Sequence, residues 1–127
     1  MKLALSATIS EIDAFCEKSL GLPVVGLMKK SGEAVADTVR KRAPRDKKVI
    51  ILAGKGNNGG DGYAAAVELM DEYKVTVYDV FSKGQKNDCG KYFLELFKSR
   101  GGEVVNFTDT EEVKQDIKAA GCIVDAV

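Results

Sequence analysis

The chain has 127 residues, of which 45% are hydrophobic and 30% are charged, which is typical of a globular protein and excludes a disordered one. Nineteen basic and nineteen acidic residues give a formal net charge of zero, so no overall charge draws the chain to nucleic acid or to an anionic membrane. The length suits one domain, and we expect residues 1–127 to form it.

The chain contains no histidine, and its three cysteines, Cys16, Cys89 and Cys122, lie far apart. Zinc-finger spacing and catalysis by Cys-His or Ser-His-Asp groups within this chain are therefore excluded. An odd, scattered set of thiols fits a reducing compartment, and no apolar run approaches the length of a signal or membrane segment. We expect a soluble, cytoplasmic protein.

Helical patterns occupy the first part of the chain. Thr8 or Ser10 is a good N-cap for a first helix, which Gly21 ends. Its apolar stripe consists of Ile9, Ile12, Phe15, Cys16 and Leu20. After a corner at Leu22-Pro23, a second helix is predicted from Val24 to about Arg42. Two helices are thus predicted to precede the first strand.

Four apolar runs predict strands, at residues 49–53, 75–80, 104–107 and 122–127. Helical segments separate them: one reaches about Tyr73, one closes at Gly101-Gly102, and a short one runs from a cap at Asp109 or Thr110 to Ala120. This alternation predicts an α/β fold, a Rossmann-like open parallel sheet with helices on both faces. Because the sequence stops on an apolar strand, we expect either an edge protected by a partner or the front part of a larger domain.

A glycine-rich segment, residues 54–62, follows the first predicted strand and opens an alanine-rich helix. Five glycines in nine positions predict a loop whose backbone can approach a ligand, and the helix start after it suits an anion. Asn57, Asn58 and Asp61 add amide and carboxylate oxygens that a plain phosphate loop does not need. A tight turn without a ligand is the alternative.

Two further aspartates end predicted strands, at the sheet edge where open α/β sheets bind ligands. Gly54-x-Gly56-x-x-Gly59 matches the dinucleotide-binding fingerprint, and Asp79 ends the next strand, where a ribose-binding acid is expected. Asp125 ends the fourth strand. Three roles are open for it: an acid/base group, an ion ligand, or an acid that simply caps the strand end. The P-loop pattern is absent.

The segment from Val49 to Leu69, with its core Gly-Asn-Asn-Gly-Gly-Asp-Gly at residues 56–62, resembles the signature of the NAD(P)H-hydrate epimerases, the YjeF N-terminal domain family. Gly21-Leu22-Pro23 with Leu27-Met28, and Ile123-Val124-Asp125-Ala126, are similar to the family's second helix and later site strand. The resemblance spans almost the whole chain in the right order. It implies an isomerase that interconverts the R and S epimers of hydrated NADH and NADPH, so that a partner dehydratase can clear both.

The resemblance also implies site residues. The substrate-contacting residues would be Asn57, Asn58, Gly59, Gly60 and Asp61. Asn58 and Asp125 would ligate a potassium ion, and Asp125 would carry the acid/base chemistry. A lysine after the second predicted strand, Lys83 or alternatively Lys86, is the second catalytic candidate. We also expect a homo-oligomer.

The sequence departs from the family pattern at its end. The family continues with a glycine-rich phosphate loop and an Asp-x-Pro-Ser-Gly-like segment, neither of which is present here, so we expect a C-terminally incomplete domain. Two alternative functions stay open. One is a non-catalytic binding or oligomerisation module that retains the fold, and the other is an ordinary NAD-binding Rossmann domain.

Overall fold

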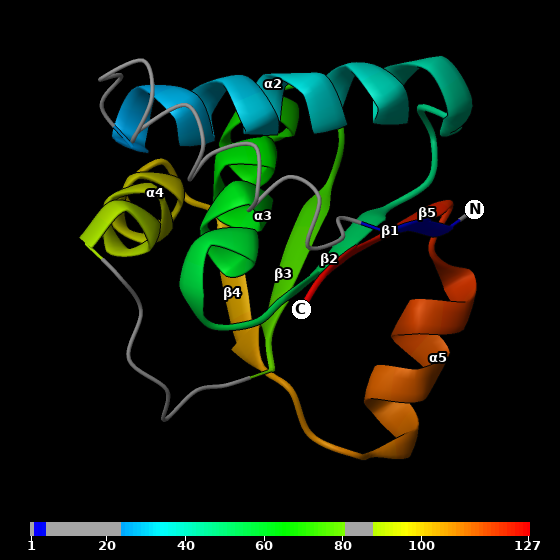
Figure 1. Cartoon of the computed structure of the whole chain (residues 1–127). Coiled ribbons are helices and arrows are strands. Elements are labelled where there is room, and N and C mark those ends of the chain that lie inside the picture. Colours follow the sequence, from blue (N-terminus) through cyan, green and yellow to red (C-terminus); the bar gives the residue numbers. More distant parts are fainter. Residues whose placement is uncertain (1, 5–23, 81–87) are drawn as a thin grey trace.

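The computed structural model describes residues 2–4, 24–80 and 88–127 (Figure 1). Three predicted features lie outside the described residues: the first helix, the corner at Leu22-Pro23, and the loop positions of Lys83 and Lys86. Within the described parts, no helix is long and apolar enough to span a membrane.

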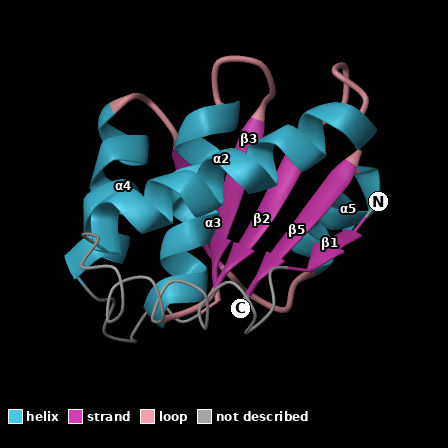
Figure 2. Ribbon diagram, turned by 45° about the horizontal axis from the view of Figure 1, so that its top comes forward, coloured by secondary structure: helices cyan, strands magenta, loops and turns pink. Residues whose placement is uncertain are grey.

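A parallel five-stranded sheet forms the centre of the described structure, in the order β1-β5-β2-β3-β4 (Figure 2). The strands are β1 (Lys2–Ala4), β2 (Val49–Ala53), β3 (Val75–Asp79), β4 (Glu103–Asn106) and β5 (Cys122–Ala126). The predicted Rossmann-like α/β fold is confirmed. The four strands expected from the apolar runs are all present, and no end is shifted by more than one residue.

The prediction that two helices precede the first strand is wrong, because β1 forms at the very start of the chain. This strand pairs in parallel with β5, Lys2 beside Ile123 and Ala4 beside Asp125. The last strand is therefore not an edge; it lies between β1 and β2. A partner that protects the last strand was one of the two expectations from the sequence. In the structure, β1 of the same chain lies beside it.

Three helices cover one face of the sheet: α2 (Val24–Arg42), α3 (Gly56–Leu69) and α4 (Asp88–Ser99) (Figures 1 and 2). Alternate residues of the central strands point into this layer, including Ile51, Val77 and Val124, and all three are fully buried. The main core lies here, with α3 lying between α2 and α4 and contacting both. Burial of these apolar groups is the main force that holds the helix layer on the sheet.

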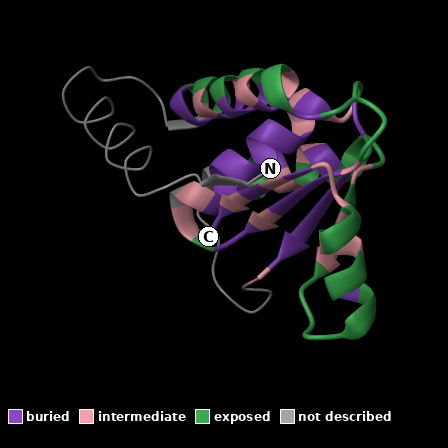
Figure 3. Cartoon of the chain, turned by 90° about the vertical axis from the view of Figure 1, so that its right-hand side faces the viewer, coloured by how far each residue is buried: buried purple, intermediate pink, exposed green. Residues whose placement is uncertain are grey.

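The opposite face carries α5 (Glu111–Ala119), which is mostly exposed (Figure 3). Val113 of this helix packs with Ile50 and Tyr78 of the sheet in a small buried cluster. Asp116 on α5 adds polar contacts: it accepts hydrogen bonds from Lys48 Nζ at 2.8 Å and from the Tyr78 hydroxyl at 2.6 Å. This half-buried group ties the helix to the sheet.

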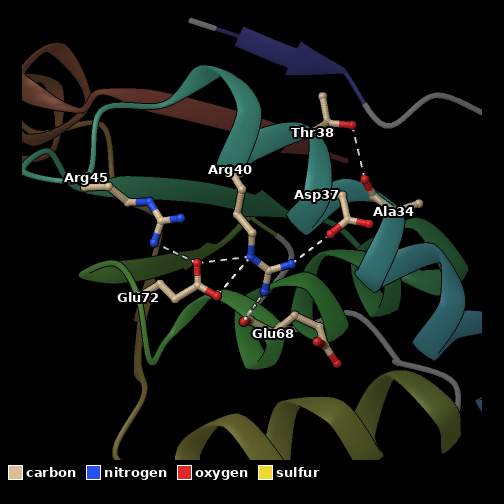
Figure 4. Close-up of polar contacts among 7 residues, drawn as sticks. All are labelled: Ala34, Asp37, Thr38, Arg40, Arg45, Glu68 and Glu72. Carbon is tan, nitrogen blue, oxygen red and sulfur yellow. Dashed lines mark hydrogen bonds and ion pairs between the residues drawn. The ribbon is translucent and has the colours of Figure 1, made fainter.

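An arginine joins the ends of α2 and α3 (Figure 4). Arg40 Nε donates to both carboxylate oxygens of Glu72, at 3.0 and 3.1 Å, and a second nitrogen donates to the backbone oxygen of Glu68 at 3.0 Å. Hydrogen bonding to Glu72 raises the pKa of Arg40, and Arg45 shares the same carboxylate at 2.9 Å. These contacts fix the C-terminal end of α3, the helix that begins in the glycine-rich segment.

Candidate functional site at the carboxyl edge of the sheet

The carboxyl ends of the parallel strands are held together by backbone hydrogen bonds. Gly54 N donates to Ala126 O at 3.0 Å, joining the end of β2 to that of β5. Val80 N donates to Ala53 O at 2.9 Å, and Phe107 N donates to Asp79 O at 2.9 Å. This edge is where open α/β sheets bind ligands, and the glycine-rich segment rises directly from it.

The glycine-rich segment is mostly helical, which corrects the prediction of a loop. Helix α3 begins at Gly56, so Asn57 to Gly62 form its first two turns, and Lys55 is its N-cap. Gly56 has a φ of 76°, a conformation that favours glycine, and it turns the chain into the helix. The side chain of Lys55 does not cap the helix, and the first turn of α3, with its positive dipole end, lies at the sheet edge.

Close packing explains the other glycines. A Cβ on Gly59 would overlap the carbonyl oxygen of Gly54, and one on Gly62 would lie 2.9 Å from the Ala126 Cβ. A Cβ on Gly60 would lie 2.5 Å from the Met28 sulfur and 3.2 Å from the Gly90 Cα. The start of α3 is thus pressed onto β5, α2 and α4 at once, which holds it rigidly against the strand ends.

The polar residues of this segment differ in burial. Asp61 is fully buried, which is unusual for an aspartate, and Asn58 is half-buried. The backbone of Asn57 lies in the first turn of α3, beside Asn58. Gly59 and Gly60 are buried. All five predicted substrate-contacting residues therefore lie in one helical start at the carboxyl edge.

Tyr63 is a buried polar residue that the sequence analysis did not identify. It lies two residues beyond Asp61 on α3 and has no exposed surface, and Asp79 at the end of β3 is 8% exposed. Burial raises the pKa of Tyr63, and the charge and hydrogen bonding of Asp79 raise it further. The sequence did hold a signal for this residue: Tyr63 follows Asp61 by two positions and is the one aromatic residue beside the alanines that open the helix.

Asp125 lies at the same edge but on the other face of the sheet. Its neighbours Val124 and Ala126 belong to the core under α3, and side chains alternate along a strand. Its register partner Leu52 packs with the cluster beneath α5. The Asp125 carboxylate accepts a hydrogen bond from Val127 N at 3.3 Å. Asp61 and Asp125 thus flank the end of the sheet from opposite faces.

The donor set at this edge suits a hard cation better than zinc. The side-chain atoms of Asn58 and Asp125 that can ligate a cation are oxygens, and hard cations prefer oxygen ligands. Among the described residues, no group of three or more Cys, Asp or Glu side chains is placed to hold a metal ion. A site here would need amide or backbone oxygens beside a single carboxylate.

Comparison with known proteins gives concordant results. The family model of the YjeF-related protein N-terminus matches residues 25–127. A bifunctional NAD(P)H-hydrate repair enzyme Nnr of Dictyoglomus turgidum is 28% identical over the whole of this chain, which covers 25% of that protein. An NAD(P)H-hydrate epimerase of Rhodopirellula baltica is 41% identical over 49% of this chain and 25% of its own length.

Among solved structures, the crystal structure of the yeast protein ynu0, YNL200c, superposes with a TM-score of 0.76 at 25% identity. It is matched over 100% of this chain and 56% of its own length. The chain therefore spans about half of that structure and about a quarter of the two enzymes named above.

Proposed function

Because the chain belongs to the family of YjeF-related protein N-termini, we propose that it carries part of the active site of an NAD(P)H-hydrate epimerase. Such an isomerase interconverts the R and S epimers of hydrated NADH and NADPH. The observation that carries the proposal is the position of Asn57 to Asp61. They form the start of a rigidly packed helix at the carboxyl edge of a parallel sheet, one strand away from Asp125.

The chemistry of epimerisation requires a proton to move to and from the hydroxyl group or the ring nitrogen of the hydrated nicotinamide. A positioned carboxylate can perform this transfer, and Asp125 is our candidate. The backbone N–H groups at the start of α3 suit the phosphate oxygens of the substrate. Asn58 and Asp61 provide side-chain oxygens for hydroxyl groups.

We further propose that Asn58 and Asp125 hold a potassium ion. When bound, this ion would offset phosphate charge near the helix start. The second catalytic candidate, Lys83, or Lys86 in its place, lies outside the described residues and stays a prediction from the family resemblance. The bifunctional relative named above supports a functional coupling of this chain to an NAD(P)H-hydrate dehydratase.

Two other functions were expected as alternatives. An ordinary NAD-binding Rossmann domain would use Asp79 for the ribose, but this carboxylate is 8% exposed and lies beside the buried Tyr63. Asp79 is already engaged in a hydrogen bond with Tyr63, which weighs against that function. The second alternative is a non-catalytic module that retains the fold. It would bind the hydrated cofactor without exchanging its epimers.

Calorimetric titration separates these functions. Hydrated NADH and unmodified NADH are titrated into the chain in potassium buffer, and the R:S ratio of the hydrate is followed by chromatography in the same samples. The epimerase proposal predicts tighter binding of the hydrate and faster epimer exchange. Binding without exchange would establish the non-catalytic module, and preference for unmodified NADH would favour the Rossmann alternative.

A further inference from the structure

Tyr63 and Asp79 form a buried polar pair at the carboxyl edge of the sheet, and the proposed reaction gives neither residue a role. Tyr63 has no exposed surface, and Asp79 is nearly as deeply buried. The Tyr63 hydroxyl donates a hydrogen bond to the Asp79 carboxylate. A carboxylate withdrawn from water needs such a donor, and a charge-assisted bond is strong and geometrically demanding. Because Tyr63 is fully buried, it can act on a substrate only through the groups that it holds in place.

The two residues belong to elements that pack on each other. Val75 and Val77 of β3 lie in the main core, so the alternation of side chains along the strand directs Asp79 toward the helix layer as well. Tyr63 of α3 is part of the same core, and α3 contacts β3. The hydrogen bond therefore connects the second turn of α3 to the last residue of β3.

The candidate site lies between two points of attachment to the sheet. Ala53, the last residue of β2, is the register partner of Asp79, and its backbone oxygen accepts a hydrogen bond from Val80 N at 2.9 Å. The chain leaves the sheet after Ala53, passes through the segment from Asn57 to Asp61, and is fastened at Tyr63 to the neighbouring strand. The proposed substrate-contacting residues are thus held from both sides.

The composition of this segment makes the second attachment important. Five of the nine residues 54–62 are glycines, which weaken a helix and carry no side chains that could grip a neighbouring element. A directional hydrogen bond at the end of the second turn constrains the rotation of α3 about its own axis. It thereby constrains where the side chains of the first two turns point.

We propose that Tyr63 is a positioning residue of the site: through its hydrogen bond to Asp79 it sets the place of the segment from Asn57 to Asp61 at the sheet edge. The effect on the substrate rests on the proposed epimerase function. Asp125, the candidate acid/base group, lies on the other face of the sheet and is not held by this bond. The pair therefore governs substrate binding and leaves the chemical step unchanged.

Tyr63→Phe tests the proposal, because it removes the hydroxyl and keeps the ring in the core. In steady-state epimer exchange it should raise KM for hydrated NADH by about five- to tenfold and leave kcat within about twofold of wild type. Tyr73→Phe is the matched control. Tyr73 is also a buried tyrosine, but its hydroxyl donates to Ala43 O at 3.0 Å, beyond the other end of α3. This variant should keep the wild-type KM.

A double variant separates positioning from stability. Tyr63→Phe combined with Asp79→Leu removes both partners, so no carboxylate is left buried without its tyrosine donor, and the melting temperature should recover toward that of wild type. KM should stay raised. If Tyr63 only stabilised the fold, KM would return together with the melting temperature.

Amide hydrogen exchange of residues 56–62 reports the attachment without any substrate. It should be faster in Tyr63→Phe than in the wild type or in Tyr73→Phe. A wild-type chain that does not exchange epimers would refute the proposed function alone, and the amide measurement would still decide whether Tyr63 holds this segment. An unchanged KM, a fall in kcat in its place, a KM that recovers in the double variant, or unchanged amide exchange would each overturn the proposal.

Discussion

Asp61 is a fully buried carboxylate in the second turn of α3, at the edge where the parallel strands end. If it contacts the substrate as proposed, Asp61→Asn removes a charge-assisted hydrogen bond while keeping the side-chain volume. We expect the affinity for hydrated NADH to fall by about ten- to a hundredfold, measured by calorimetry.

The matched control is Asp71→Asn, an exposed aspartate just beyond the other end of α3. It should bind hydrated NADH as the wild-type chain does. Equal affinities of the Asp61 and Asp71 variants, both folded by circular dichroism, would remove Asp61 from the binding site.

Asp125 is the carboxylate proposed to hold potassium, and a thermal melt tests this role without any enzyme assay. An ion that binds only the folded chain raises the melting temperature. We therefore expect a higher melting temperature in potassium chloride than in sodium chloride at the same ionic strength, and we expect Asp125→Asn to abolish the difference. A wild-type chain that melts at the same temperature in both salts would contradict the potassium site.

The packing of α3 is the feature that most restricts its sequence. In Gly59→Ala the new methyl group would overlap the backbone oxygen of Gly54, and neither backbone can move easily because both are hydrogen-bonded into the fold. We expect the free energy of unfolding in urea to fall by about 3 kcal/mol.

Gly26→Ala is the control for this substitution. Gly26 is an exposed residue of α2 with no atom within 4 Å of the position that a Cβ would take. Alanine is the better helix former, so this variant should be more stable by roughly 0.5–1 kcal/mol. A Gly59 variant as stable as wild type would mean that α3 does not press on the strand ends.

The attachment of α5 to the sheet predicts a pH dependence of stability. Burial alone would raise the pKa of Asp116, but hydrogen bonds from Lys48 and Tyr78 outweigh it, and the pKa lies below its ordinary value of 3.8. A group with a depressed folded pKa stabilises the fold above its unfolded pKa and loses this contribution as the pH falls through the folded pKa.

At neutral pH we therefore expect Asp116→Asn to lower the free energy of unfolding by about 1 kcal/mol, since both partners of the ion pair are partly exposed. The difference from wild type should shrink once the pH falls below 3.8 and vanish below the folded pKa of Asp116, which is lower still. Asp109→Asn, which removes an exposed pair with Lys114, should change little at either pH. A difference that persists in acid would show that the charge of Asp116 is not what holds α5.

At the scale of the molecule, the regular elements could be predicted because their signals are local. The apolar run at residues 49–53 gives β2 at its predicted bounds, and the span from Val24 to Arg42 gives α2. β1 could not be predicted, since three residues carry no periodicity and the strand exists only through pairing with β5, more than a hundred residues away.

The start of α3 was missed for a different reason. Each glycine inside a helix costs about 1 kcal/mol relative to alanine, so five in nine residues indicate a loop. Contacts of Gly59, Gly60 and Gly62 with other elements override this preference, and they become visible only when the fold is assembled. The sequence predicted that Asp125 and the segment from Asn57 to Asp61 share one edge. It did not predict that Asp61 and Asp125 flank that edge from opposite faces, because this depends on the register of β5 beside β2.

The rate of epimer exchange tests the central claim most directly. The purified chain is mixed with the pure S epimer of hydrated NADH in potassium buffer, and the appearance of the R epimer is followed by chromatography against a sample without protein. We predict exchange that is faster than the spontaneous rate, slower without potassium and abolished in Asp125→Asn. A folded chain that binds the hydrate but leaves the spontaneous rate unchanged would contradict it.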